Sequence, residues 1–286
     1  MVHQRAYAKV NLTLTVLGRR TDGYHELESL VTFADLHDVV TLELGTEGSV
    51  TVTGPFAQSI DGENLLIRGL ALLRDAEPRL SLGSVNLEKN LPVAAGLGGG
   101  SADAAALLRA VRQANPTLAA NVPWLDIAAR LGADVPVCLG AQPALMSGIG
   151  EKIAPVPRLP QANAVIVNPR QPLPTADVFR ALNAAPAASL QSSPVPPDLH
   201  HLSDLLDYMR ARGNDLEAPA TRLLPAIGEI KAALETQPGC LLAAMSGSGP
   251  TCFGIFADRA QARLAADRIA GAHSGWWVKP TVLQGS

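Results

Sequence analysis

Hydrophobic and polar residues alternate along the first segment of the chain. From Lys9 to Val16 every second residue is apolar, and the residues between them are polar. Such alternation predicts a strand with one apolar face and one polar face. Gly18 ends the pattern, and the Asp-Gly pair at residues 22–23 predicts a turn directly after it.

The rest of the first half mixes short apolar runs with helical spacing. The runs predict further strands over residues 29–33, 39–44, 50–53 and 85–88. Leucines at helical spacing predict a helix over residues 64–74, and two more helices are expected over 102–113 and 124–131.

The second half has a different order of elements. Its patterns predict strands over residues 165–167, 240–244 and 252–256, and helices over 175–182, 202–210, 225–235 and 259–270. Residues 184–197 form a connector rich in Pro, Ala and Ser. The order is typical of an α+β layer. Because proline is frequent over residues 155–161, we expect one domain over residues 1–157 and a second over 158–286.

Composition excludes several classes of protein. The chain has 286 residues with a net charge of −3, and no block of Lys and Arg, which argues against nucleic-acid or membrane-surface binding. Its three cysteines form no C-x-x-C pair, so buried thiols in a reducing compartment are favoured over disulfides or zinc. The start resembles no signal peptide, and a turn at residues 246–250 divides the one long uncharged stretch. We therefore expect a cytoplasmic protein.

A glycine-rich loop is the densest feature of the sequence. Four of the five residues from Gly96 to Gly100 are glycine, and a helix follows directly. Bare backbone N–H groups at a helix N-terminus suit a phosphate, although a linker or a structural turn is the alternative. No Lys follows the glycines, as a P-loop requires, and Ser101 occupies the sixth position of a dinucleotide fingerprint, where Gly or Ala belongs.

A second loop of this kind runs from Ser246 to Pro250, between two apolar strands. Alone it is equally well explained as a simple hairpin. Two loops of Gly and Ser in one chain favour a ligand with several phosphates.

Lys9 and Asp134 are the two charged residues that suggest chemistry. A lysine in a strand is usually solvated, and Asp134 is either a helix cap or a buried functional group. If the fold brings them together beside a phosphate loop, the carboxylate can accept the proton of a hydroxyl that attacks a phosphoryl group.

These motifs resemble the GHMP kinases, the superfamily of galactokinase, homoserine, mevalonate and phosphomevalonate kinases. Its three signatures match residues 6–12, 91–106 and 245–253. Residues 18–25, 131–136, 148–151 and 214–217 are similar to one branch that acts on a cytidyl substrate. The resemblance implies an N-terminal domain of the ribosomal-protein-S5 type and a ferredoxin-like C-terminal domain. The implied reaction transfers the ATP γ-phosphate to the 2-hydroxyl of a cytidyl sugar alcohol, in the non-mevalonate route to isoprenoids.

The resemblance also implies the site residues. Lys9 and Asp134 match the catalytic pair. The ATP-phosphate loop corresponds to Pro92, Val93, Ala94, Ala95, Gly96, Leu97, Gly98, Gly99, Gly100, Ser101 and Ala102, with Asn64 and Lys89 near the adenine. The substrate side corresponds to Asn11, Tyr24, His25, Thr175 and Phe179, with Gly247, Ser248 and Gly249 of the second loop. ATP implies Mg²⁺. Since Ala102 replaces a hydroxyl found in many superfamily loops, no metal ligand is predicted.

Two other functions stay open at this point. One is a different GHMP kinase, of the homoserine or mevalonate type, and the other is a nucleotide-binding module without catalysis. The presence of both Lys9 and Asp134 favours turnover. We expect a monomer or a weak homodimer, and Trp276 and Trp277 to lie in the core or on a contact surface.

Overall fold

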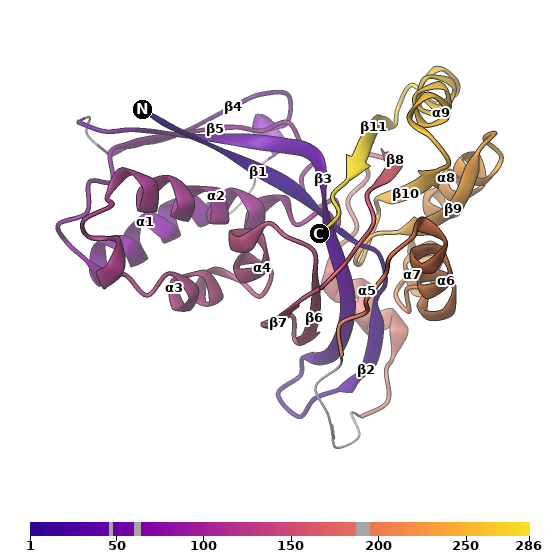
Figure 1. The fold of residues 1–286 in the computed structure, drawn as a ribbon, viewed down its shortest axis with the longest axis horizontal. Coiled ribbons are helices and arrows are strands. Elements are labelled where there is room, and N and C mark those ends of the chain that lie inside the picture. The colour runs from indigo at the N-terminus through magenta and orange to yellow at the C-terminus, as the bar shows by residue number, and fades with distance from the viewer. Residues whose placement is uncertain (46–47, 60–63, 187–194) are drawn as a thin grey trace. The chain divides into compact units, whose positions relative to one another are not determined.

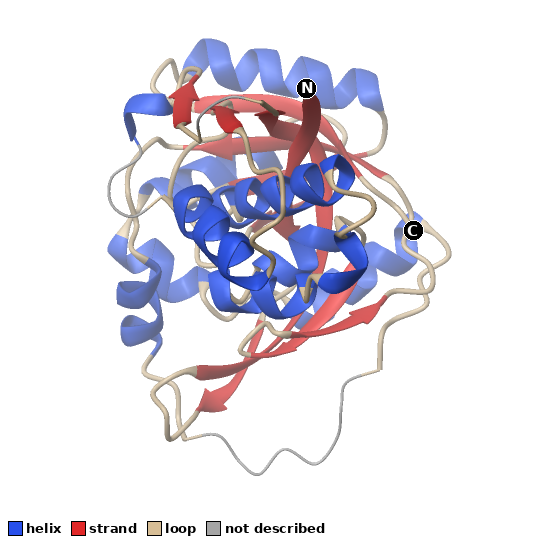
Figure 2. Ribbon diagram, turned by 90° about the vertical axis from the view of Figure 1, so that its left-hand side faces the viewer, coloured by secondary structure: helices blue, strands red, loops and turns tan. Residues whose placement is uncertain are grey.

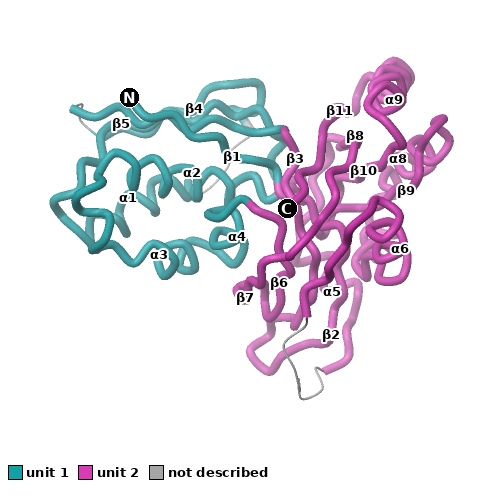
Figure 3. The backbone as a smooth tube through the Cα atoms, viewed as in Figure 1, with its two compact units in different colours: residues 1–8, 36–93, 98–141 teal, residues 9–35, 94–97, 142–286 magenta. Residues whose placement is uncertain are grey.

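The computed structural model describes residues 1–45, 48–59, 64–186 and 195–286, so the connector predicted at 184–197 lies partly outside the described residues. The chain forms two compact units, and neither is continuous in sequence (Figure 3). The first comprises residues 1–8, 36–93 and 98–141, and the second residues 9–35, 94–97 and 142–286. The domain boundary expected after residue 157 divides the chain along its sequence and stays a prediction.

The first unit contains a small sheet. Its strands are β4 (Val50–Thr53), β5 (Ser84–Glu88), most of β1 (Val2–Asn11) and the second half of β3 (His25–Glu43). Strand β5 pairs antiparallel with β3, with Val39 opposite Glu88, and parallel with β4. Strands β1 and β3 both continue into the second unit.

Four helices form a layer beside this sheet (Figures 1 and 2). They are α1 (Leu65–Ala76), α2 (Gly99–Ala114), α3 (Trp124–Leu131) and α4 (Val135–Gly140), with short 3-10 turns η1 (Ala57–Ser59) and η2 (Ala119–Asn121). Helix α2 packs on the other three. Its small alanine side chains allow this close approach, and Leu107 and Leu108 are fully buried.

The second unit begins with a hairpin. Strand β2 (Thr15–Arg19) pairs antiparallel with the first half of β3, which pairs on its other side with β6 (Ala144–Gly148). Strand β7 (Lys152–Pro155) then pairs with β6. The polar turn predicted at residues 19–23 joins β2 to β3.

A four-stranded antiparallel sheet makes up the rest of this unit. Its order is β11 (Trp277–Leu283), β8 (Ala162–Asn168), β10 (Cys252–Phe256) and β9 (Cys240–Met245). The helices are α5 (Thr175–Leu182), α6 (Leu202–Arg212), α7 (Glu217–Leu223), α8 (Ala226–Glu235) and α9 (Arg259–Ala272). Helices α8 and α9 pack on the sheet and bury a core that includes Ile227, Ile269 and Phe256. This is the expected ferredoxin-like arrangement.

Several details differ from the sequence predictions. The strands expected over residues 29–33 and 39–44 are one strand, β3. The strand continues through the polar residues between these two runs, where the Asp38 side chain is fully buried and hydrogen-bonded. The strand expected over residues 9–16 is divided between β1 and β2. Its polar face is not solvated, because Lys9, Asn11 and Thr13 are all buried.

Candidate active site

The hydroxyl of Ser246 connects three distant parts of the chain within the second unit. Its Oγ accepts a hydrogen bond from the backbone N–H of Asn11, at 3.1 Å, and donates one to the carbonyl oxygen of Gly96, at 3.0 Å. The first strand, the glycine-rich loop and the second Gly/Ser loop therefore meet at one buried side chain.

The backbone strengthens this junction. The N–H of Lys9 donates to the carbonyl of Leu97, at 2.8 Å, and the N–H of Thr251 donates to that of Ala95, at 3.3 Å. A Cβ on Gly96 would lie 2.7 Å from the carbonyl oxygens of both Ser246 and Gly249, and φ at Gly96 is +73°. Only glycine fits at this position.

The Asn11 side chain lies beside the second loop. Its Nδ2 donates to the Ser29 hydroxyl, at 2.7 Å, and that hydroxyl donates to the carbonyl of Thr13, at 2.6 Å. Its Oδ1 lies 3.2 Å from the position that a Cβ on Gly247 would occupy. The polar face of the first strand is thus a buried hydrogen-bonded network next to the loop.

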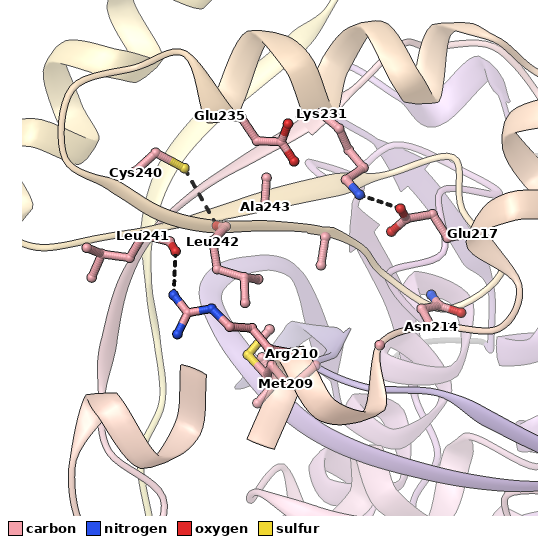
Figure 4. A pocket seen from close by; sticks show the side chains of 13 residues that line it. Met209, Arg210, Asn214, Glu217, Lys231, Glu235, Cys240, Leu241, Leu242 and Ala243 are labelled. Atoms are coloured by element: carbon pink, nitrogen blue, oxygen red, sulfur yellow. Dashed lines mark hydrogen bonds and ion pairs between the residues drawn. The ribbon is translucent and has the colours of Figure 1, made fainter. Parts of the chain in front are cut away.

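Hydrogen bonds from the segment at residues 214–217 also stabilise the second Gly/Ser loop. Asn214 Nδ2 donates to the carbonyls of Met245 and Gly247, both at 2.9 Å, and a Glu217 carboxylate oxygen accepts from the Met245 N–H, at 3.2 Å. Figure 4 shows Glu217 and Lys231 reaching toward each other beside β9, and they form an ion pair. Asn214, Glu217 and Lys231 line a cavity of about 410 Å³. The segment at 214–217 therefore supports the loop.

The remainder of the glycine-rich loop belongs to the first unit. Gly98 has φ +61° and precedes α2, which begins at Gly99, earlier than the predicted residue 102. The N–H groups of the first helical turn have no partner within the helix, so this end suits an anion. Ala102 is buried, and its N–H donates to the Gly98 carbonyl. Before the loop, Pro92 is buried and Val93 is exposed.

The two residues assigned to the adenine have structural partners. Asn64 caps α1, because its side-chain oxygen accepts from the Leu66 N–H at 2.9 Å. Lys89 is buried, and its Nζ donates to Asp38 Oδ2 at 2.5 Å and to Asp103 Oδ2 at 2.7 Å. The sequence reasoning missed both carboxylates. The one signal was Asp103, a charge inside an otherwise alanine-rich segment.

Four of the residues predicted to bind substrate line one cavity in the second unit. It has a volume of about 640 Å³ and is lined by Tyr24, His25, Thr175 and Phe179, among others. The His25 and Phe179 rings stack, with centroids 4.7 Å apart and planes 26° apart. The hydroxyls of Thr175 and Ser248 are 2.8 Å apart, so the cavity wall is bonded to the second Gly/Ser loop.

The turn before β3 presents this aromatic pair. The Asp22 carboxylate accepts from the Tyr24 N–H at 3.1 Å, and the Arg20 N–H donates to the Tyr24 carbonyl at 2.8 Å. The Tyr24 side chain is 61% exposed, as expected for a residue near a loop tip. Burial, with a smaller contribution from Arg19, lowers the pKa of His25, so its ring is neutral at pH 7.

Lys9 and Asp134 belong to different units. Lys9 lies in β1 of the second unit, and Asp134 occupies the N-cap position of α4 in the first. Their pairing stays a prediction.

No group of three or more His, Cys, Asp or Glu side chains could hold a metal ion within the described part of the chain. Among the same residues, no helix is both long enough and apolar enough to cross a bilayer.

Comparisons with known proteins agree with the geometry. The model of the GHMP kinases N terminal domain matches residues 64–142, and that of the GHMP kinases C terminal domain matches residues 190–274. The chain is 50% identical to the 4-diphosphocytidyl-2-C-methyl-D-erythritol kinase of Rhodopseudomonas palustris strain CGA009, over 97% of this chain and 95% of that one. It is 49% identical to the kinase of the same name from Parvibaculum lavamentivorans, over 99% of both chains.

Solved structures give the same result. A crystal structure of 4-(cytidine 5'-diphospho)-2C-methyl-D-erythritol kinase matches with a TM-score of 0.78 and 35% identity, over 100% of both chains. The homoserine kinase of Cytophaga hutchinsonii matches with a TM-score of 0.69 over 99% of this chain and 94% of that one, but at 17% identity it shows only a shared fold. The expected α+β fold with two GHMP kinase domains is confirmed. The chain belongs to the GHMP kinase family, within the 4-diphosphocytidyl-2-C-methyl-D-erythritol kinases.

Proposed function

We propose that this protein is an ATP-dependent kinase that phosphorylates the 2-hydroxyl of 4-diphosphocytidyl-2-C-methyl-D-erythritol. The observation that carries the proposal is the cavity lined by Tyr24, His25, Thr175 and Phe179. Identity near one half to kinases of that name, over nearly the whole chain, supports the same substrate.

The chemistry of this cavity suits a cytidine diphosphate group. A neutral His25 ring has one donor and one acceptor, which match the amino group and an acceptor on the edge of cytosine. The aromatic faces of Tyr24 and Phe179 can stack on the base. Arg19 and Arg180 also line the cavity, and guanidinium groups suit a diphosphate.

The glycine-rich loop would hold the phosphates of ATP. The N–H groups at the start of α2 suit a phosphate chain, because they have no partner within the helix. The residues from Pro92 to Ala102 form this site in our proposal. Asn64 and Lys89 are assigned to its adenine end. Gly247, Ser248 and Gly249 lie on the substrate side, where the Ser248 hydroxyl is bonded to Thr175.

Lys9 and Asp134 are the proposed catalytic pair. The substrate 2-hydroxyl attacks the γ-phosphorus, the bond to the β–γ bridging oxygen breaks, and ADP leaves. The Asp134 carboxylate accepts the hydroxyl proton, and the Lys9 ammonium orients the hydroxyl and keeps the carboxylate ionised.

We also propose Mg²⁺ as a cofactor. The charge of ATP argues for this ion, which proteins usually hold through a few carboxylates together with substrate phosphates and water. When bound, it would neutralise phosphate charge.

A cytoplasmic location fits three cysteines that are all free thiols.

An assay of ADP release tests the proposal against its alternatives. The purified protein is supplied with ATP, Mg²⁺ and one acceptor at a time: the cytidyl sugar alcohol, homoserine or mevalonate. Turnover with the cytidyl substrate alone supports the proposal. Faster turnover with homoserine or mevalonate would favour another GHMP kinase, and ATP binding without release of ADP would favour a binding module.

A further inference from the structure

Three buried charges lie beneath the start of α2 in the first unit. Asp38 comes from β3, Lys89 from the residue after β5, and Asp103 from the second turn of α2. The exposed fractions of their side chains are 0%, 3% and 5%. Burial of an ammonium group and two carboxylates costs free energy, because each ion loses its hydration. Attraction between the ions offsets this cost only when their geometry and hydrogen bonds are good.

The ammonium of Lys89 lies directly against the glycine-rich loop. A Cβ added to Gly99, the first residue of α2, would be 3.1 Å from Lys89 Nζ. The same position would be 4.0 Å from Asp38 Oδ2. The three charged residues therefore pack against the first turn of α2.

The two carboxylates are not equivalent. Asp38 accepts three hydrogen bonds, two of them from the backbone N–H groups of Asn90 and Leu91. Asp103 Oδ2 accepts one from Lys89, and its buried Oδ1 has no hydrogen-bond partner among the residues that the structure describes. Asp103 is thus the less stabilised anion of the two.

The group carries one negative charge in excess when both carboxylates are ionised. That charge lies under the helix end where the phosphates of a nucleotide would bind, so bound phosphate repels it. Protonation of Asp103 would remove the excess charge and leave the Lys89–Asp38 pair neutral.

We propose that Asp38 and Asp103 are positioning residues for the nucleotide: they hold the Lys89 ammonium against Gly99, and Asp103 takes up a proton when phosphate binds. The inference rests on the proposed function, because it takes the start of α2 as the site of the ATP phosphates. Lys89, assigned above to the adenine end of the site, then also acts on the phosphates, through the backbone of Gly99 and through its charge.

Electrostatics agrees with this assignment. Burial raises the pKa of the Asp103 carboxyl to about 8; Lys89 opposes this rise and Asp38 adds to it. Burial also disfavours the charge of Lys89, but the two carboxylates more than compensate and raise its pKa. Lys89 and Asp38 are the charged groups that act on Asp103. Between pH 7 and 9 the Asp103 carboxyl therefore changes its protonation state.

Calorimetric binding of ADP with excess Mg²⁺ between pH 7.5 and 9.5 tests the inference. In this range a phosphate monoester is fully ionised, since its last pKa is about 6. The wild-type Kd should rise by roughly three- to tenfold with pH as Asp103 loses its proton. Asp103→Asn keeps a side-chain oxygen for Lys89 but cannot ionise, so its Kd should be independent of pH. Asp126→Asn, an exposed carboxylate on α3, should follow the wild type.

The cation is tested separately. Lys89→Met alone leaves two buried carboxylates without a cation, which destabilises the fold, so it is combined with Asp103→Asn. The double variant should be folded by circular dichroism and bind ADP at least tenfold more weakly than Asp103→Asn.

Parallel pH profiles for the wild type and Asp103→Asn, or equal ADP affinity in the double variant, would overturn the inference. Failure of the wild type to bind ADP at any pH would instead overturn the proposed function.

Discussion

The Ser246 hydroxyl donates a hydrogen bond to the carbonyl oxygen of Gly96, although the two residues are 150 positions apart. The Ser246 Oγ also accepts a hydrogen bond from the N–H of Asn11, and Ser246 is fully buried. One side chain thereby fixes the glycine-rich loop, the first strand and the second Gly/Ser loop relative to one another within the second unit.

Replacement of Ser246 by alanine should therefore destabilise the protein. It leaves the Asn11 N–H and the Gly96 carbonyl buried without a partner, at a cost of about 1–3 kcal/mol for each group. Denaturant unfolding should show the loss, and turnover should fall as well. The control is Ser203→Ala, which removes an exposed hydroxyl from α6. Equal unfolding midpoints for the two variants would show that the junction contributes little.

Gly96→Ala should abolish or strongly weaken ATP binding. The new Cβ would lie 2.7 Å from two backbone oxygens, and the positive φ is unfavourable for alanine. Gly271→Ala in α9 is the matched control, because a Cβ there meets nothing within 4 Å and alanine favours a helix by up to ~1 kcal/mol. Calorimetry with ATP should separate the two variants. Normal affinity in Gly96→Ala would show that the loop backbone can move without loss of the site.

Asp134→Asn should lower kcat far more than it raises the KM for ATP. A general base contributes about 10²–10⁴ in rate. Lys9→Ala should behave in the same way, and the double variant should be little worse than either, because residues that act as a unit are not additive. Asp75→Asn, an exposed carboxylate on α1, is the control in steady-state kinetics. Near-normal turnover in Asp134→Asn would refute the assignment.

His25→Ala and Tyr24→Ala should each raise the KM for the cytidyl substrate roughly ten- to hundredfold, because an unpaired polar edge or a lost stacking ring costs ~1–3 kcal/mol. The KM for ATP should change little. His200→Ala, a half-exposed histidine paired with Asp198 in the same unit, serves as the control. A parallel rise in both KM values would mean that the base does not bind in this cavity.

The KM for the cytidyl substrate should also depend on pH through His25. Burial lowers the pKa of this imidazole below its ordinary value of about 6.5, so the ring is neutral above that pH. As pH falls below 6.5 the ring gains a proton and loses its acceptor, so KM should rise. Stability should fall in the same direction, since the unfolded chain binds the proton first. Both trends should weaken in His25→Ala, and an unchanged KM profile in that variant would assign the effect to another group.

Local patterns in the sequence predicted the helices best. The bounds of α3 and α5 agree with the predicted ranges, because each carries an amphipathic pattern that begins directly after a Pro and ends at a Gly or Asn. Strand β11 was missed because Pro280 lies inside it. Strand β8 covers one side of β11, while β3 meets it at Leu283, away from that proline.

The residues of the candidate site also fall into those that the sequence reveals and those that it does not. Loops and the Tyr24–His25 pair are contiguous in sequence, so their composition reveals them. The Asp38–Lys89–Asp103 group and the Ser246 junction come from segments far apart, and no local spacing encodes them. Asp38 is an example: the groups that donate hydrogen bonds to its carboxylate lie more than fifty residues later in the chain, so nothing near it in sequence indicates that it is buried.

The pairing of β11 with β3 has a consequence for how the protein is made. The Thr32 hydroxyl donates to the carbonyl of Gln284, 252 positions later, and Leu283 lies opposite Ala34. The hairpin of β2 and β3 can form soon after it leaves the ribosome, but its neighbour on this side, β11, begins only at Trp277. Contacts of such long sequence separation slow folding. The part of β3 around Ala34 therefore gains this sheet neighbour only after more than two hundred further residues have been made, so the pairing of β3 with β11 belongs to a late stage of folding.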